Sequence, residues 1–189
     1  MPRSPRRAAV LACLLVLAVV SPLAPAHAAP PEPLADYQPA AHCAPKAKPG
    51  TRVLARWLER RYGSRTTISR SCTPGGDVSS EHQEGRAIDW FADARTPAGR
   101  ASARALLDAL LAPDAAGNVA AKARRMGVMY VIWNDRMYAA WDAFRPGPYL
   151  SSSCRNRRTC SPTLRHRDHV HISLTRRAAR GLTSWYLAR

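Results

Sequence analysis

The sequence of 189 residues lacks three features that would indicate common kinds of site or anchor. No two cysteines have the short C-x-x-C spacing, which argues against a zinc site built on cysteines. Phosphodiesterases that use two histidine-x-serine/threonine motifs need a second copy, and the chain has such a motif once, at residues 171–173. The one long apolar run, Ala8 to Val20, is too short for a convincing membrane span.

Acidic residues are also scarce, because 13 Asp and Glu stand against 29 Lys and Arg, for a formal net charge of +16. Such an excess says little about the fold. It predicts attraction to anionic partners such as wall polymers, acidic glycans, membranes or nucleic acid. The alternative interpretation is that a high-GC organism uses arginine freely, and composition leaves both open.

The first 28 residues have the pattern of a secretory signal peptide. Arg3, Arg6 and Arg7 precede the apolar run, and Ala26-His27-Ala28 supplies a small-x-small cleavage site. Cleavage would remove three arginines and no acids, so that +16 becomes +13. We therefore predict a secreted protein, extracellular or in the cell wall, with no stable membrane anchor after cleavage.

Four cysteines remain beyond this leader, and an even number in an exported chain predicts disulfides. Three pairings are possible, and the sequence does not choose among them. A bond between Cys154 and Cys160 would close a small arginine-rich loop and would leave Cys43 with Cys72. That second bridge would pin the proline-rich segment to the start of the candidate site.

The rest of the chain divides into an arm and one domain. Residues 29–50 contain six prolines and almost no apolar periodicity, which predicts an extended arm. Residues 51–189 have the size of a single domain. Helices are expected over 51–62, 97–112, 118–126 and near the C-terminus, and strands over 66–70, 86–91, 128–133, 137–141 and 169–174. These elements predict the α+β class, with a small, mainly antiparallel sheet and flanking helices.

Two segments far apart in the chain supply the candidate site. Side chains alternate along a strand, so His169 and His171 share one face of the last expected strand. Upstream, His82 precedes a strand that contains Asp89, and a carboxylate in an apolar strand is costly unless it is paired or coordinated. One imidazole and one carboxylate from here, with one imidazole from the distant strand, form a His₂Asp set. Three protein ligands with a vacant fourth position are typical of a catalytic zinc site.

The motif Ser80-x-His82-x-x-Gly85-x-Ala87-x-Asp89, followed far downstream by His169-x-His171, resembles a known family. It is similar to the zinc D-Ala-D-Ala carboxypeptidases and their peptidoglycan endopeptidase relatives, which include the vancomycin-resistance D,D-peptidases and share the hedgehog/D,D-peptidase fold. The resemblance covers Thr66 to Ser173, and all five fixed positions of the first motif match. Residues 127–141 also resemble the central hairpin of secreted actinobacterial members.

This resemblance implies that His82, Asp89 and His171 bind one Zn²⁺ per chain. It implies a secreted zinc metallopeptidase, of D,D-carboxypeptidase or endopeptidase type, that hydrolyses peptide bonds of peptidoglycan stem peptides or cross-links. The expected partner is peptidoglycan or an anionic wall polymer, not nucleic acid, and the oligomeric state is not indicated. The alternative is a catalytically silent, zinc-stabilised basic domain that binds anionic wall polymer.

The resemblance leaves the general base open among three residues. Some relatives carry a glutamate three residues before the last zinc histidine, where Asp168 stands here. Others carry histidines two and five residues before it, which match His169 and His166. A regular strand would turn Asp168 away from the histidine face, so Asp168 can be the base only if the strand begins after it. Otherwise Asp168 orients a zinc histidine.

Arg70 occupies a stretch where relatives carry a substrate-binding arginine. Its guanidinium would hold a peptide carboxylate through two parallel hydrogen bonds. The alternative is an ordinary surface arginine, one of many in this chain.

Overall fold

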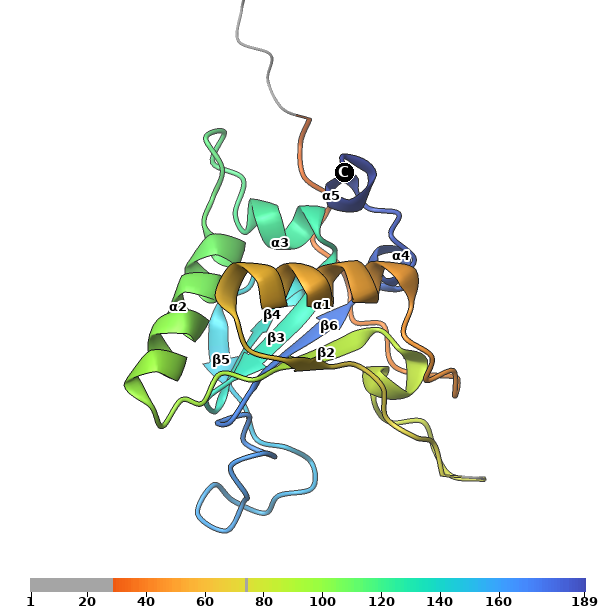
Figure 1. The fold of residues 1–189 in the computed structure, drawn as a ribbon, viewed down its shortest axis with the longest axis vertical. Coiled ribbons are helices and arrows are strands. Elements are labelled where there is room, and N and C mark those ends of the chain that lie inside the picture. Colours follow the sequence, from red (N-terminus) through yellow and green to blue (C-terminus); the bar gives the residue numbers. More distant parts are fainter. Residues whose placement is uncertain (1–28, 74) are drawn as a thin grey trace, which may run out of the picture.

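The structure is a computed structural model that describes residues 29–73 and 75–189 (Figure 1). The predicted signal peptide, residues 1–28, lies outside the described residues. Within them no helix is long and apolar enough to cross a membrane. A six-stranded antiparallel sheet with flanking helices forms the domain, which confirms the predicted α+β class.

The sheet combines strands from both halves of the chain in the order β1-β2-β6-β3-β4-β5. Every neighbouring pair is antiparallel. The strands are β1 (Thr66–Thr67), β2 (Ala87–Trp90), β3 (Val128–Trp133), β4 (Arg136–Ala139), β5 (Pro146–Pro148) and β6 (Val170–Leu174). The last strand therefore lies between β2 and β3, which places the two histidine segments side by side.

The helices are α1 (Pro49–Tyr62), α2 (Pro97–Leu111), α3 (Ala121–Arg125), α4 (Arg176–Ala179) and α5 (Ser184–Leu187), with 3₁₀ turns η1 (Glu81–Glu84) and η2 (Ala140–Asp142). The start of α2 is as predicted, because the Thr96 side chain caps it by accepting a hydrogen bond from the Gly99 amide and Pro97 follows. Helix α1 begins two residues earlier than predicted, at Pro49, and proline is well suited to the first turn of a helix.

Alternation along the strands gives the sheet two different faces. Val170, Ile172 and Leu174 of β6 are buried in the main apolar core, which also contains Leu54 and Leu58 of α1 and Leu106 and Leu110 of α2. Figure 1 shows α1 crossing this side of the sheet. The alternate residues of β6 point to the opposite face. The histidines of the candidate site are therefore on the face that α1 and α2 leave open.

Two predicted elements are shorter in the structure than expected. The strand predicted over 66–70 ends at Thr67, and the next carbonyl, that of Ile68, accepts a hydrogen bond from His82 Nδ1 instead of from another strand. The helix predicted over 118–126 begins only at Ala121, because Ala120 has a φ of 48°, outside the right-handed helical region.

The hairpin after β3 also differs in detail. Asn134 and Asp135 both have positive φ, as the two central residues of a tight hairpin turn require. Strand β4 then ends at Ala139, because the chain turns into η2. Strand β5 was not predicted, since its prolines argue against a strand, and at the sheet edge they are tolerated. The single predicted C-terminal helix is two short ones, α4 and α5.

The proline-rich arm lies against the domain and is tied to it at several points. Arg86 is only 2 % exposed, and its guanidinium donates to the carbonyls of Gln38 in the arm and Leu174 at the end of β6. Near the other end of the arm, Glu32 accepts hydrogen bonds from the backbone and side chain of Ser184.

The four cysteines form two disulfides. Cys43 is bonded to Cys72, which joins the arm to the segment before η1, and Cys154 is bonded to Cys160. Of the three pairings open to the sequence, this one closes the small arginine-rich loop. Disulfides fit a protein of an oxidising compartment.

Candidate metal centre

Three side chains from three elements meet on the sheet face that α1 and α2 leave open. His82 comes from η1, Asp89 from β2 and His171 from β6, and all three could hold a metal ion together. Asp89 and His171 are direct partners across the antiparallel β2–β6 pair, which brings their side chains into contact. The predicted ligands therefore lie together.

The three donor atoms form a nearly equilateral triangle. Asp89 Oδ1 is 3.1 Å from His82 Nε2 and 3.0 Å from His171 Nδ1, and the two nitrogens are 3.2 Å apart. A tetrahedral ion with bonds near 2.0–2.1 Å separates its ligand atoms by about 3.3 Å. The spacing therefore fits a small ion bound by all three atoms.

Hydrogen bonds on the far side of each imidazole fix which nitrogen faces the centre. His82 Nδ1–H donates to the Ile68 carbonyl at 2.6 Å, which leaves Nε2 with its lone pair free. His171 Nε2–H donates to Ser173 Oγ at 2.9 Å, which leaves Nδ1 free. Such outer hydrogen bonds hold the ring and the tautomer of metal-binding histidines.

The protonation states also suit a cation. Burial alone would raise the pKa of Asp89, but the adjoining His171 and His82 side chains outweigh it and hold this pKa well below its usual range. Burial lowers the pKa of His171. The carboxylate is therefore charged and this imidazole neutral, which are the forms that bind a metal ion.

Local backbone chemistry places His82. Ser80 begins η1 with a capping box, in which its hydroxyl and the Gln83 side chain satisfy amides of the first turn. Gly85 ends the turn with a φ of 65°, and a Cβ there would lie 2.2 Å from the Lys46 carbonyl oxygen. No other residue fits this position, so the serine and glycine of the motif act by shaping the turn.

A buried chain of contacts extends from His171 away from the centre. Ser173, whose Oγ accepts from His171, is the cross-strand partner of Tyr130, and Tyr130 Oη donates to Glu81 Oε2 at 2.6 Å. The Tyr130 ring also stacks on the His171 ring, with centroids 5.5 Å apart. Burial and the nearby Glu81 raise the pKa of Tyr130, so the phenol stays neutral and remains a donor.

Sequence reasoning missed this chain of contacts. Ser173 carries a signal, since it lies two residues after His171 and so shares its strand face. No sequence pattern indicates Tyr130 or Glu81, because their positions depend on how β3 pairs with β6 and on how η1 packs.

Asp168 and His169 form a second pair beside the triangle. His169 Nδ1–H donates to Asp168 Oδ1 at 2.7 Å, and its Nε2 lies 3.4 Å from Asp89 Oδ1. The other carboxylate oxygen of Asp168 accepts from the Thr163 hydroxyl at 2.6 Å. Strand β6 begins at Val170, after Asp168, so the carboxylate is free to turn toward His169.

His166 completes the cluster of rings. Its centroid lies 4.8 Å from that of His169 and 5.4 Å from that of His171. Burial, with the neighbouring histidines, lowers the pKa of His166 to about 3, so it is neutral near pH 7. Its Nδ1 is buried and has no hydrogen-bond partner among residues 29–73 and 75–189.

These side chains line a cleft of ≈ 270 Å³. The cleft reaches from the metal triangle to the exposed Arg70, and three consecutive serines, Ser151 to Ser153, line it as well. Arg70 therefore lies at the cleft. The cleft can admit a small polar ligand to the triangle.

A family model described as VldE, C-terminal domain, matches residues 43–156, more than half of the chain. The matched range contains His82 and Asp89 and ends before His171. The comparisons with curated proteins and with solved structures gave no match.

Proposed function

The chain belongs to the family described as VldE, C-terminal domain, a description that states no reaction, so we propose its function from the side chains of the cleft. The protein is an exported, zinc-dependent peptidase that hydrolyses peptide bonds of peptidoglycan stem peptides or cross-links. The observation that carries this proposal is the His82–Asp89–His171 triangle within an open cleft.

The donor set supports zinc as the metal. Two imidazole nitrogens and one carboxylate oxygen suit zinc, whereas magnesium and calcium sites are built from oxygen ligands. Three protein ligands also leave a coordination position for water or substrate. A zinc ion bound there supplies Lewis acidity, which lowers the pKa of water and polarises a carbonyl group.

Among the three residues considered as general base, the geometry favours His169. Its Nε2 faces the triangle, while its Nδ1–H is held by Asp168. Both oxygens of Asp168 are already engaged, by His169 and Thr163, so Asp168 positions the imidazole. His169 takes a proton from the attacking water and delivers it to the leaving amine.

His166 and Arg70 have binding roles in this scheme. His166 is neutral and buried at the edge of the triangle, where a ring N–H can donate to the oxygen of the carbonyl under attack. Arg70 at the exposed part of the cleft holds a substrate carboxylate through its guanidinium. A hydrolysis of this kind needs no serine or cysteine nucleophile.

The zinc content of the mature protein tests the proposal, with His82→Ala as the matched variant. After dialysis against a weak chelator, we expect about one zinc per wild-type chain and none in the variant. Purified muropeptides are then digested by both proteins, and only the wild type should release new products. A folded wild-type protein that contains no zinc would refute the proposal that it is a zinc peptidase.

A zinc-stabilised domain that binds anionic wall polymer without turnover is the second candidate. The observation in its favour is the set of exposed arginines in the loop that follows β5. Salt-sensitive binding to purified walls without any muropeptide product would favour this candidate over the peptidase.

A further inference from the structure

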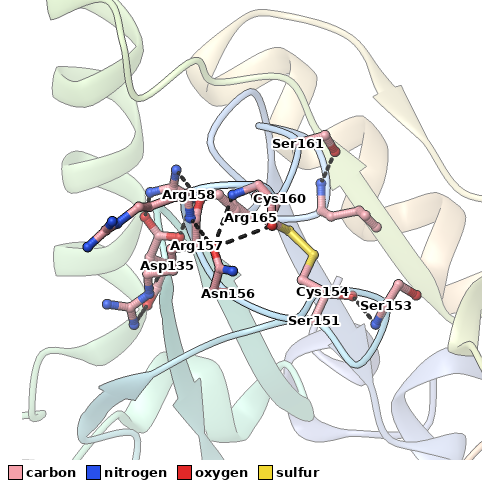
Figure 2. Close-up of a disulfide and its surroundings, with 12 residues drawn as sticks. Asp135, Ser151, Ser153, Cys154, Asn156, Arg157, Arg158, Cys160, Ser161 and Arg165 are labelled. Carbon is pink, nitrogen blue, oxygen red and sulfur yellow. Dashed lines mark hydrogen bonds and ion pairs between the residues drawn. A yellow bond between two sulfur atoms is a disulfide. The ribbon is translucent and has the colours of Figure 1, made fainter.

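Residues 151–165, between β5 and β6, form a compact loop with four arginines and no acidic residue (Figure 2). The Cys154–Cys160 disulfide closes it. Inside the closed segment, Asn156 Oδ1 accepts hydrogen bonds from the amides of Arg158 and Thr159, at 2.9 and 3.1 Å. Covalent and local contacts therefore hold the loop without any helix or strand.

Hydrogen bonds hold the C-terminal end of the loop against the β3–β4 turn. Arg165 donates two hydrogen bonds to the Asp135 carboxylate, at 2.8 and 2.7 Å, and the Asp135 amide donates back to the Arg165 carbonyl at 3.1 Å. These contacts with Arg165 hold the pKa of Asp135 below its usual range. Figure 2 shows Arg157, Arg158 and Arg165 gathered near Asp135.

The loop is also a wall of the metal cleft. Ser151, Ser152 and Ser153 line the cleft where the chain enters the loop, and Thr163 and Leu164 line it where the chain returns. Arg155 follows Ser153 by two residues, a distance of at most about 7 Å along an extended chain. Arg155 therefore lies close to the rim of the cleft, and Arg158 belongs to the same disulfide-closed segment.

Two of these arginines have no anionic partner in the part of the chain that the structure describes. Arg155 and Arg158 are exposed, and neither side chain makes an ion pair or hydrogen bond to a described residue. The nearby Asp135 is occupied by Arg165. A guanidinium fork matches the geometry of a carboxylate or a phosphate.

We propose that residues 151–165 are the substrate-recognition wall of the cleft, and that Arg155 and Arg158 bind an anionic group of the substrate outside the bond to be hydrolysed. This inference rests on the proposed peptidase and adds that the enzyme selects substrates by a second negative charge, a carboxylate or a phosphate. The disulfide and the Asp135–Arg165 pair preorganise the arginines, so less conformational entropy is lost on binding.

The test measures binding to the zinc-loaded mature protein by fluorescence anisotropy. One probe is a labelled stem peptide with a free side-chain carboxylate, and the other is the same peptide amidated there. We expect R155A/R158A to bind the acidic peptide about tenfold more weakly, the size of losing charge-assisted hydrogen bonds at an exposed rim, and the amidated peptide equally well. The control R56A/R60A removes two exposed charges from α1 and should change neither.

Equal binding of the two peptides by the wild type, or equal losses in both double variants, overturns the recognition wall. A poly(glycerol phosphate) competitor distinguishes the anion, since displacement of the acidic peptide shows that the arginines also take phosphate. The two proposals fail separately. Charge-dependent binding without hydrolysis overturns the peptidase alone. Hydrolysis at the same rate for the acidic and amidated peptides, and by the wild type and R155A/R158A, overturns the recognition wall alone.

Discussion

The two faces of β6 put neighbouring residues into opposite environments. Ile172 packs with the helices in the apolar core, and His171 points into the candidate metal centre, although both side chains are buried. Ile172 gains stability from burial itself. His171 is buried at a cost that its hydrogen bond to Ser173 and its stacking on Tyr130 help to offset. One face therefore stabilises the fold, and the other keeps donor atoms close together for a ligand.

The largest expected effect comes from His171→Ala, which should remove function without unfolding the protein. We expect zinc content to fall from about one per chain to none and muropeptide hydrolysis to disappear, because one of three ligands is lost. The far-UV circular dichroism spectrum should stay unchanged, since the core on the other face is intact. His42→Ala, at an exposed histidine of the arm outside the cleft, is the control. Turnover by the His171 variant would contradict the assignment.

For Ile172→Ala we expect the opposite result, a loss of stability without a loss of zinc binding. Truncating a fully buried isoleucine leaves a cavity and should lower the free energy of unfolding by about 2–5 kcal/mol. Urea unfolding measures this loss, and the folded fraction should still bind zinc. Leu182→Ala, at a residue 43 % exposed, should cost far less. If Ile172→Ala abolished zinc binding in the folded protein, the two faces would not be independent.

Tyr130→Phe tests the chain of contacts behind His171. Losing the phenol should leave Glu81 without a donor and loosen Ser173, so we expect zinc affinity to fall about 10–100-fold, as for other groups that orient a metal ligand. Competition with a chromophoric chelator measures this change. Tyr186→Phe is the matched control, because the Tyr186 hydroxyl is buried without a partner among the described residues. Equal affinities for both variants would show that Tyr130 only packs.

The smallest effect is expected for Ser80→Ala at the start of η1. Losing this cap should lower the free energy of unfolding by about 1 kcal/mol. Because η1 carries His82, zinc affinity should fall by a few-fold as well. Thermal unfolding with and without zinc measures both quantities, and exposed Ser153 supplies the control substitution to alanine. A loss of stability with unchanged zinc affinity would show that the turn is not needed to hold His82.

Strand alternation and the resemblance of the two motifs together grouped the candidate ligands. Alternation along β6 assigned His169 and His171 to one face, and an aspartate within an apolar strand indicated a partner for it. What periodicity cannot supply is the pairing between elements. The Ile68 carbonyl that fixes the His82 tautomer became available because β1 ends early, and Tyr130 meets Ser173 through the pairing of β3 with β6.

The fold shows the same division between local and tertiary causes. The start of α2 was predictable because Thr96 and Pro97 are local signals that act within one turn. The late start of α3 was not, because the positive φ of Ala120 runs against its own preference and is imposed by its surroundings. Strand β5 could not be predicted either, because its prolines are acceptable only at a sheet edge and its edge position is set by the tertiary structure.

The contacts of the arm have a consequence for the order in which the molecule assembles. Glu32 is bonded to Ser184, 152 residues later, and Gln38 is bonded to Arg176, 138 residues later. These segments lie among the first and last parts of the domain to be synthesised. The side chains of Glu32 and Gln38 therefore have to wait for these partners until nearly the whole chain has emerged. Contacts so distant in sequence close slowly, and a shortened chain that lacks α5 would leave the Glu32 carboxylate without its partner Ser184.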